Sequence, residues 1–214
     1  MTGHAPRAER PIETMTNSVF FRDAQILQKA MRKSIAASPD AFLKTVGDVN
    51  EKPIGYWINE IRSATWAVIE RGEEVLGIAA AKWPDREIDI EDQDTARFIE
   101  SVWIAPELRG NEMGERLVRY LFEVECRKDP NIRQFLLWVF ERNLPAINLY
   151  LRMGFEYTAV NQWHDQVGMT ELKYQLAFDG GVVRAIEMAV NDAARRDDLR
   201  KFGVRYRVLG EDLA

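Results

Sequence analysis

RFIESVWIAPELRGNEMG, residues Arg97–Gly114, is the stretch around which we interpret the chain. An apolar-rich run from Phe98 to Ala105 is typical of a strand, and a proline and a glycine-bearing turn follow it. An amphipathic segment that begins near Asn111 is typical of a helix. A strand that passes through a tight turn into a helix directs several unpaired backbone N–H groups toward one point. The aligned peptide dipoles make that point favourable for an anion such as a phosphate.

The 214 residues, of which 46% are hydrophobic and 29% are charged, predict a globular domain with an ample core. The formal net charge of −5 argues against nucleic acid as a partner. Cys126 is the only cysteine, so no intramolecular disulfide can form, and we expect a cytoplasmic protein. Apolar runs stay far below the roughly 18 residues that a membrane span needs, so we expect no membrane association.

Apolar periodicity predicts the remaining elements. Upstream we expect a strand at 17–21, a helix at 23–37, a second helix opened by Pro53, and a hairpin of strands 65–71 and 75–83. Downstream we expect a helix to about residue 128, a strand at 135–140, a helix from Asn143 to Gly154, and an antiparallel pair, 155–160 and 171–178. Hairpins beside crossover helices predict an α+β (mixed α/β) fold with a central mixed, mostly antiparallel sheet flanked by helices.

We expect three regions along the chain. Residues 1–16 are charged and carry two prolines, which predicts a flexible leader. Residues 17–179 form the main domain, and Gly180-Gly181 marks its end. The extension 180–214 contains a predicted helix from Val183 to about Asp198, whose apolar face must dock on its own body or on a second subunit. A homodimer formed through this C-terminal helix is therefore one expectation.

A second motif lies downstream: Asn143-x-x-Ala146-x-x-x-Tyr150-x-x-x-Gly154-Phe155. The stretch from Arg109 to Gly114 also follows, with one departure, the pattern Gln/Arg-x-x-Gly-x-Gly/Ala. With both motifs at this spacing and the element order in agreement, the sequence resembles the GNAT superfamily of acyl-CoA-dependent N-acetyltransferases over roughly residues 20–178. The resemblance implies a GNAT-like fold and acetyl-CoA as the acyl donor.

The resemblance also implies a set of cofactor-binding residues. Loop amides would hold the CoA pyrophosphate, the backbone of the preceding strand would pair with the pantetheine arm, and the residues concerned are Ile104, Arg109, Gly110, Asn111, Met113 and Gly114. Asn143 caps its helix, binds cofactor, or does both. Glu112 departs from the pattern because it replaces the first glycine, so we expect weakened cofactor affinity unless its carboxylate turns toward solvent. The alternative is that this strand–loop–helix connection binds no cofactor, and that the negative charge of Glu112 only interacts favourably with the helix dipole.

For the chemistry, the resemblance implies that Tyr150 protonates the departing thiolate; the alternative is a tyrosine that only covers the core. Glu100 is our first candidate for the general base, because an acid among apolar strand residues can have a raised pKa. A carboxylate on the exposed side of the strand is the alternative. Glu141 and His164 are weaker candidates, and an isolated histidine in a polar loop is more often merely exposed. Trp138 stands where some relatives place a glutamate, so that assignment does not transfer.

The acceptor is expected to be a small-molecule amine or a peptide amine. The acidic segment from Pro84 to Asp94 is either a solvated loop or a rim that attracts a cationic acceptor. Five tryptophans could line an acceptor slot, although most are expected in the core: Trp57, Trp83, Trp103, Trp138 and Trp163. We expect neither a metal nor a nucleophilic role for Cys126, so the amine attacks the thioester directly. The alternative function is a non-catalytic GNAT-fold binding or assembly module with a degraded cofactor loop.

Overall fold

The computed structural model describes residues 12–177 and 201–211. Within these ranges seven strands form one sheet in the order β5-β6-β4-β3-β2-β1-β7. The strands are β1 (Ala64–Arg71), β2 (Glu74–Lys82), β3 (Ala96–Ile104), β4 (Gln134–Phe140), β5 (Glu156–His164), β6 (Met169–Ala177) and β7 (Arg205–Val208). The helices are α1 (Ile12–Ala37), α2 (Val46–Glu51), α3 (Ile54–Ser63), α4 (Met113–Lys128) and α5 (Leu144–Arg152), with 3-10 turns η1 (Pro39–Ala41) and η2 (Pro106–Leu108).

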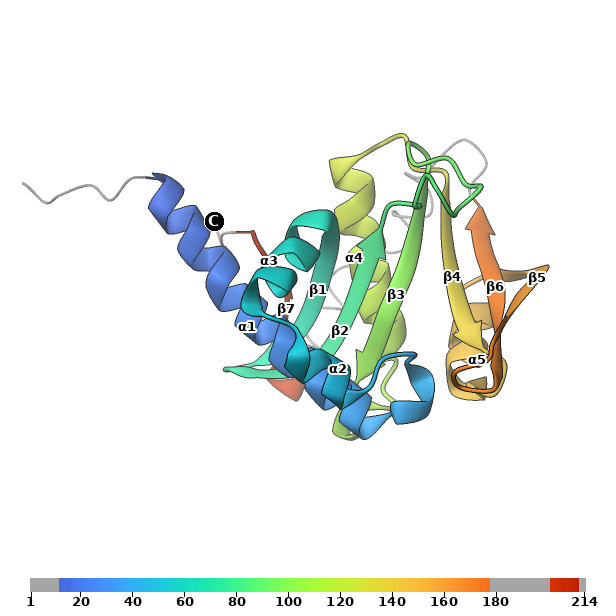
Figure 1. The fold of residues 1–214 in the computed structure, drawn as a ribbon, viewed down its shortest axis with the longest axis horizontal. Helices are drawn as coiled ribbons and strands as arrows, with labels where there is room; N and C mark the ends of the chain where they lie inside the picture. The colour runs from blue at the N-terminus through green and yellow to red at the C-terminus, as the bar shows by residue number, and fades with distance from the viewer. Residues whose placement is uncertain (1–11, 178–200, 212–214) are drawn as a thin grey trace, which may run out of the picture.

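The sheet is mixed and mostly antiparallel, as predicted. Of the strand pairs, β3 and β4 run parallel and the others run antiparallel. Helices α1, α2 and α3 cover one face, and α4 lies across the opposite face (Figure 1). Two aromatic rings join α4 to the sheet, because Phe122 stacks on Phe135 of β4 with centroids 4.0 Å apart. The predicted α+β class is confirmed.

The parallel pair β3 and β4 comes apart partway along its length. Its register covers only three pairs, which end at Phe98 and Leu136, and beyond them the two strands diverge (Figure 1). On its other side β3 carries a bulge: Ile78 pairs with Trp103, but Ala80 pairs with Glu100. Ser101, within the bulge, has a φ of 54°. A bulge bends its strand and locally increases its twist, which accounts for the direction in which β3 leaves β4.

Two elements upstream of β1 differ from the sequence-based expectations. The strand predicted at 17–21 is wrong, because these residues belong to α1. Phe20 is partly buried against the core and lies on the same face of α1 as the buried residues Ala24 and Leu27. Its apolar side chain therefore belongs to the buried face of a helix and does not indicate a strand. The short helix α2 was not predicted; its signal is a capping box in which Thr45 and Asp48 bond each other's backbone N–H.

The C-terminal extension contributes a strand that was not predicted. Strand β7 pairs antiparallel with β1, and Val208 lies opposite Ala67. The predicted helix over 183–198, and the homodimer that it was expected to form, lie outside the described residues. No helix within 12–177 or 201–211 combines the length and apolar character needed to cross a membrane.

Candidate active site

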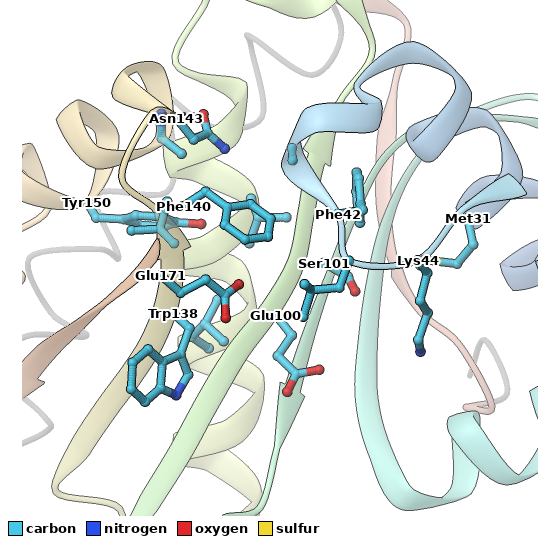
Figure 2. Close-up of a pocket in the computed structure, with 16 residues that line it drawn as sticks. Met31, Phe42, Lys44, Glu100, Ser101, Trp138, Phe140, Asn143, Tyr150 and Glu171 are labelled. Atoms are coloured by element: carbon cyan, nitrogen blue, oxygen red, sulfur yellow. Dashed lines mark hydrogen bonds between the residues drawn. The ribbon is translucent and has the colours of Figure 1, made fainter. Parts of the chain in front are cut away.

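A cavity of about 280 Å³ opens where β3 and β4 part. Figure 2 shows Tyr150, Trp138 and Glu171 on its β4–α5–β6 side, and Glu100 and Ser101 on the opposite side along β3. The segment between α1 and α2 closes this second side with Phe42 and Lys44. The strand divergence therefore creates a half-open cavity on which side chains from several elements converge, as is typical of small-molecule sites.

The Tyr150 hydroxyl points into this cavity (Figure 2). The side chain is only 6% exposed, and its ring packs edge-on against Phe155 at 5.6 Å between centroids. Burial raises the pKa of the Tyr150 phenol above its ordinary value of 10.0. The phenol therefore stays protonated at neutral pH, which is the form that can donate a proton.

Glu171 and His164 form a hydrogen-bonded pair beside Tyr150. His164 Nε2 lies 2.9 Å from Glu171 Oε2, and each side chain is 16% exposed. Burial raises the pKa of Glu171, although the hydrogen bond from His164 partly offsets this effect. The expectation that His164 is merely exposed is wrong. Glu171 was missed in the sequence because only the pairing of β6 with β4, which sets it opposite Phe140, brings it to the cavity.

Glu100 also faces the cavity but differs from our expectation. Its side chain is 47% exposed rather than buried among apolar residues, and Lys82 Nζ lies 3.2 Å from its Oε2. Lys82 is bonded equally closely to Glu60. Although burial alone would lower the pKa of Lys82, the charges of Glu100 and Glu60 raise it, which keeps the ammonium protonated. Glu100 is thus one end of an ion-paired cluster.

The loop before α4 has the geometry of an anion cradle. The first bond within the helix runs from the Arg116 N–H to the Glu112 C=O, so the three preceding N–H groups lie ahead of the helical ladder. Gly110 has a φ of +76°, and a Cβ on Gly114 would come within 3.3 Å of Leu149 on α5. The glycines therefore permit both the turn and the close approach of α5, and the donors present fit a pyrophosphate.

Glu112 occupies a position that favours glycine, with φ 58° and ψ 9°. Its carboxylate turns outward: the side chain is 74% exposed and lies 3.4 Å from Arg116 Nη2. This orientation turns the carboxylate away from the N–H groups at the helix start, although its charge stays nearby, and it is the condition under which we expected the cradle to survive. The backbone strain of a left-handed non-glycine residue remains.

Glu112→Gly should tighten acetyl-CoA binding by about 2- to 5-fold, because a nearby charge at a helix start is worth roughly 0.3–1 kcal/mol. It should not lower the unfolding midpoint, since glycine adopts this φ without strain. Isothermal titration calorimetry measures the affinity. Glu107→Gln, which removes an exposed charge from the same loop, is the control and should change binding less. Weaker binding by Glu112→Gly would contradict the prediction.

The backbone N–H and C=O groups of Ile104 lie on the edge of β3 that faces away from β2, at the end of the strand where β4 no longer pairs with it. The Ala105 N–H bonds Leu76 on β2, so by alternation the polar groups of Ile104 point the other way. Arg109 already fills part of this edge, because its Nε donates to the Ile104 carbonyl at 2.9 Å and its Nη2 donates to Ser38. Pairing with pantetheine would therefore rely on the Ile104 N–H.

Three further residues have roles that the contacts define. Asn143 caps α5, since its Oδ1 accepts from the Ala146 N–H at 3.3 Å, and it also lines the cavity. Asn111 steadies the loop by donating to the Arg109 carbonyl. Burial raises the pKa of the Cys126 thiol to about 12, so it carries no thiolate at neutral pH.

A second cavity adjoins the first through two shared lining residues, Glu100 and Trp138. The acidic segment forms its wall, and the ionisable lining consists of four carboxylates and two cations: Asp85, Glu87, Asp89, Glu100, Lys82 and Arg86. Trp83 also lines it, whereas Trp57 and Trp103 belong to the core and Trp163 is 58% exposed elsewhere. The acidic segment is thus part of a cavity wall.

Comparison with known protein families assigns this chain to a class of acyl-transferring enzymes. Residues 29–155 match the Acetyltransferase (GNAT) family. This match spans more than half of the chain, which therefore belongs to the GNAT acetyltransferases, whose general reaction is acetyl transfer to amines.

Individual relatives agree with this assignment. The thialysine N-epsilon-acetyltransferase of Sus scrofa is 31% identical over 68 residues, which span 31% of this chain and only 39% of that protein. The fold resembles ribosomal-protein-alanine N-acetyltransferase from Brucella melitensis (TM-score 0.57, 21% identity, 73% of this chain and 96% of that one). It also resembles Arabidopsis thaliana NAA60 in complex with acetyl-CoA (TM-score 0.55, 17% identity, 73% and 95%).

Proposed function

We propose that this protein transfers an acetyl group from acetyl-CoA to a primary amine by direct attack of the amine nitrogen. The observation that carries the proposal is the buried Tyr150 hydroxyl, which faces a cavity at the point where β3 leaves β4. The anion cradle at the start of α4 supports it, because Met113 and Gly114 supply main-chain donors there. Bound acetyl-CoA would supply the activated acetyl group.

The proposed reaction assigns a role to the Tyr150 hydroxyl and to the Ile104 backbone N–H. Tyr150 holds the proton that the departing sulfur needs, and burial keeps its phenol neutral. The Ile104 N–H, on the open edge of β3, is a hydrogen-bond donor for the acyl donor in the gap. Cys126 takes no part, so no covalent acyl-enzyme is required.

The acceptor is proposed to be a cationic amine. In the second cavity the carboxylates outnumber the cations, which favours a positively charged acceptor. The rings of Trp83 and Trp138, which also line it, already face Arg97 and Lys173. The names of the relatives suggest two kinds of probe: thialysine for a small side-chain amine, and an alanine-initiated peptide for an α-amine. Of these, the acidic cavity favours the small molecule, which carries two ammonium groups.

Acetyl-CoA binding is the first test. At 100 times its dissociation constant the ligand should stabilise the fold by about 2.7 kcal/mol, which a thermal-shift titration measures. Acetylation of thialysine, a linear diamine and an alanine-initiated peptide should then be compared by following release of free thiol. We expect the two small molecules with two ammonium groups each to react faster than the peptide, and increasingly so at low salt, because exposed charges are screened by ions.

A non-catalytic binding module is the alternative function, motivated by Glu112 in the cofactor loop. The two functions differ in a simple observation: the module releases no thiol with any of the amines. Absence of both a thermal shift and thiol release would overturn the proposed enzyme. The same result would favour the module, whose cofactor loop is degraded.

A further inference from the structure

We propose that Glu171 is the general base that removes the proton from the acceptor ammonium, and that His164 is the positioning residue that orients it. This inference rests on the proposed function. Glu171 comes from β6 and His164 from the end of β5, and neither belongs to the two sequence motifs. In Figure 2 the Glu171 carboxylate projects into the gap between Tyr150 and Glu100. A proton acceptor and a proton donor therefore face the same space.

The packing fixes this carboxylate. Glu171 lies opposite Phe140 in the β4–β6 register, and the β5–β6 hairpin brings His164 beside it. The His164 ring packs edge-on against Phe140 with centroids 6.1 Å apart. His164 Nε2 lies 2.9 Å from Oε2. The second carboxylate oxygen, Oε1, shows no hydrogen bond to the residues that the structure describes, so it can take a proton from the amine. An oriented carboxylate with one such oxygen is the arrangement that a general base needs.

The surrounding charges favour Glu171 over Glu100 for this task. Glu100 approaches from β3 and is paired with Lys82, whose ammonium remains charged. Glu171 faces Glu100 across the cavity, with Lys44 on the α1–α2 segment and Tyr150 on α5 as the other titratable groups lining it. Burial, and to a lesser extent the charge of Glu100, raise the pKa of Glu171 above the ordinary 4.5. Glu171 is thereby a stronger base, whereas Lys82 neutralises Glu100.

The proton balance of the reaction explains why a base is required. At pH 7 about one in 2,500 alkylamines of pKa near 10.4 is neutral, and only the neutral nitrogen can attack. Glu171 takes one proton from the ammonium and later releases it to solvent. As the C–N bond forms and the C–S bond breaks, Tyr150 gives its proton to sulfur. The second nitrogen proton then restores the Tyr150 hydroxyl, so the amide, the thiol and one released proton account for all atoms.

Glu171→Gln should lower kcat/KM for an alkylamine by about 100-fold at pH 7, a typical contribution of a general base. This deficit should shrink as the pH rises toward the pKa of the amine, because a neutral amine no longer needs a base. The matched control is Glu156→Gln, an exposed carboxylate on β5, which should act like wild type. A deficit that is the same at every pH, or no deficit, would overturn the role of Glu171.

The role of His164 has a readout that does not depend on turnover. In ¹³C-labelled protein without acetyl-CoA, the Glu171 carboxyl should titrate above 4.5, and His164→Leu should raise its pKa further because the hydrogen bond is lost. His164→Gln, which keeps a donor, should shift it less. An unchanged titration in His164→Leu would overturn the positioning role. If wild type acetylates amines and Tyr150→Phe is impaired while Glu171→Gln is not, this inference fails and the proposed function stands.

Discussion

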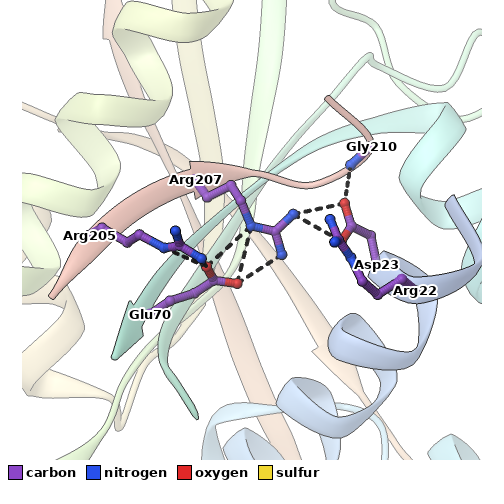
Figure 3. A network of polar contacts seen from close by, with 6 residues as sticks. All are labelled: Arg22, Asp23, Glu70, Arg205, Arg207 and Gly210. Carbon is purple, nitrogen blue, oxygen red and sulfur yellow. Dashed lines mark hydrogen bonds and ion pairs between the residues drawn. The ribbon is translucent and has the colours of Figure 1, made fainter. Parts of the chain in front are cut away.

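Replacing Arg207 with methionine should lower the free energy of unfolding by about 3–5 kcal/mol, the usual effect of removing one partner from a buried ion pair. Arg207 is 4% exposed and joins two buried carboxylates, Asp23 of α1 and Glu70 of β1 (Figure 3). Its Nη1 lies 2.8 Å from Asp23 Oδ2, and its Nη2 lies 2.8 Å from Glu70 Oε1. Without the guanidinium, both carboxylates lose their central buried cation. The Gly210 N–H, which also donates to Asp23, cannot replace the charge.

Arg205→Met is the matched control for this prediction. Arg205 lies on the same strand and also contacts Glu70, but its side chain is 58% exposed. Pairs with an exposed partner contribute roughly 0–1 kcal/mol, so this variant should lose little stability. Urea unfolding, followed by tryptophan fluorescence, measures both variants. Equal stabilities of the two would show that the buried network does not secure β7.

Tyr150→Phe should reduce kcat by about 10²- to 10⁴-fold, the range found for general acids. The change removes only the hydroxyl, so the ring keeps its contact with Phe155 and acetyl-CoA affinity should stay unchanged. Wild-type activity should not decline from loss of the Tyr150 proton below pH 10, because burial raises the pKa of this phenol above 10.0. Deprotonation would abolish donation only above that pKa.

The matched control here is Tyr157→Phe, which deletes a hydroxyl from a half-exposed tyrosine on β5. Stopped-flow measurement of thiol release gives kcat, and calorimetry gives the dissociation constant of acetyl-CoA. Should Tyr150→Phe and Tyr157→Phe turn over equally fast, Tyr150 is not the acid. A large loss of acetyl-CoA binding in Tyr150→Phe would instead assign it to the cofactor site.

Local patterns were sufficient for most of the fold. The turn chemistry and apolar periodicity around residues 97–114 predicted β3, the loop and α4, because strands and helices impose different spacings on their buried side chains. The same logic failed at 17–21, where a short apolar run fits either period. It also missed β7, whose four residues form a strand only because the edge of β1 is available to them.

The residues of the candidate site divide in the same way. Tyr150 and the α4 loop could be predicted, since each lies within a motif of fixed spacing along one element. The Glu171–His164 pair and the ion pairing of Glu100 with Lys82 could not, because each joins residues from different strands. Contacts between distant segments depend on sheet register and on the divergence of β3 from β4, which local periodicity does not encode. Chain pattern therefore specified the loop before α4 and the position of Tyr150, and tertiary packing brought Glu171 to the cavity that Tyr150 faces.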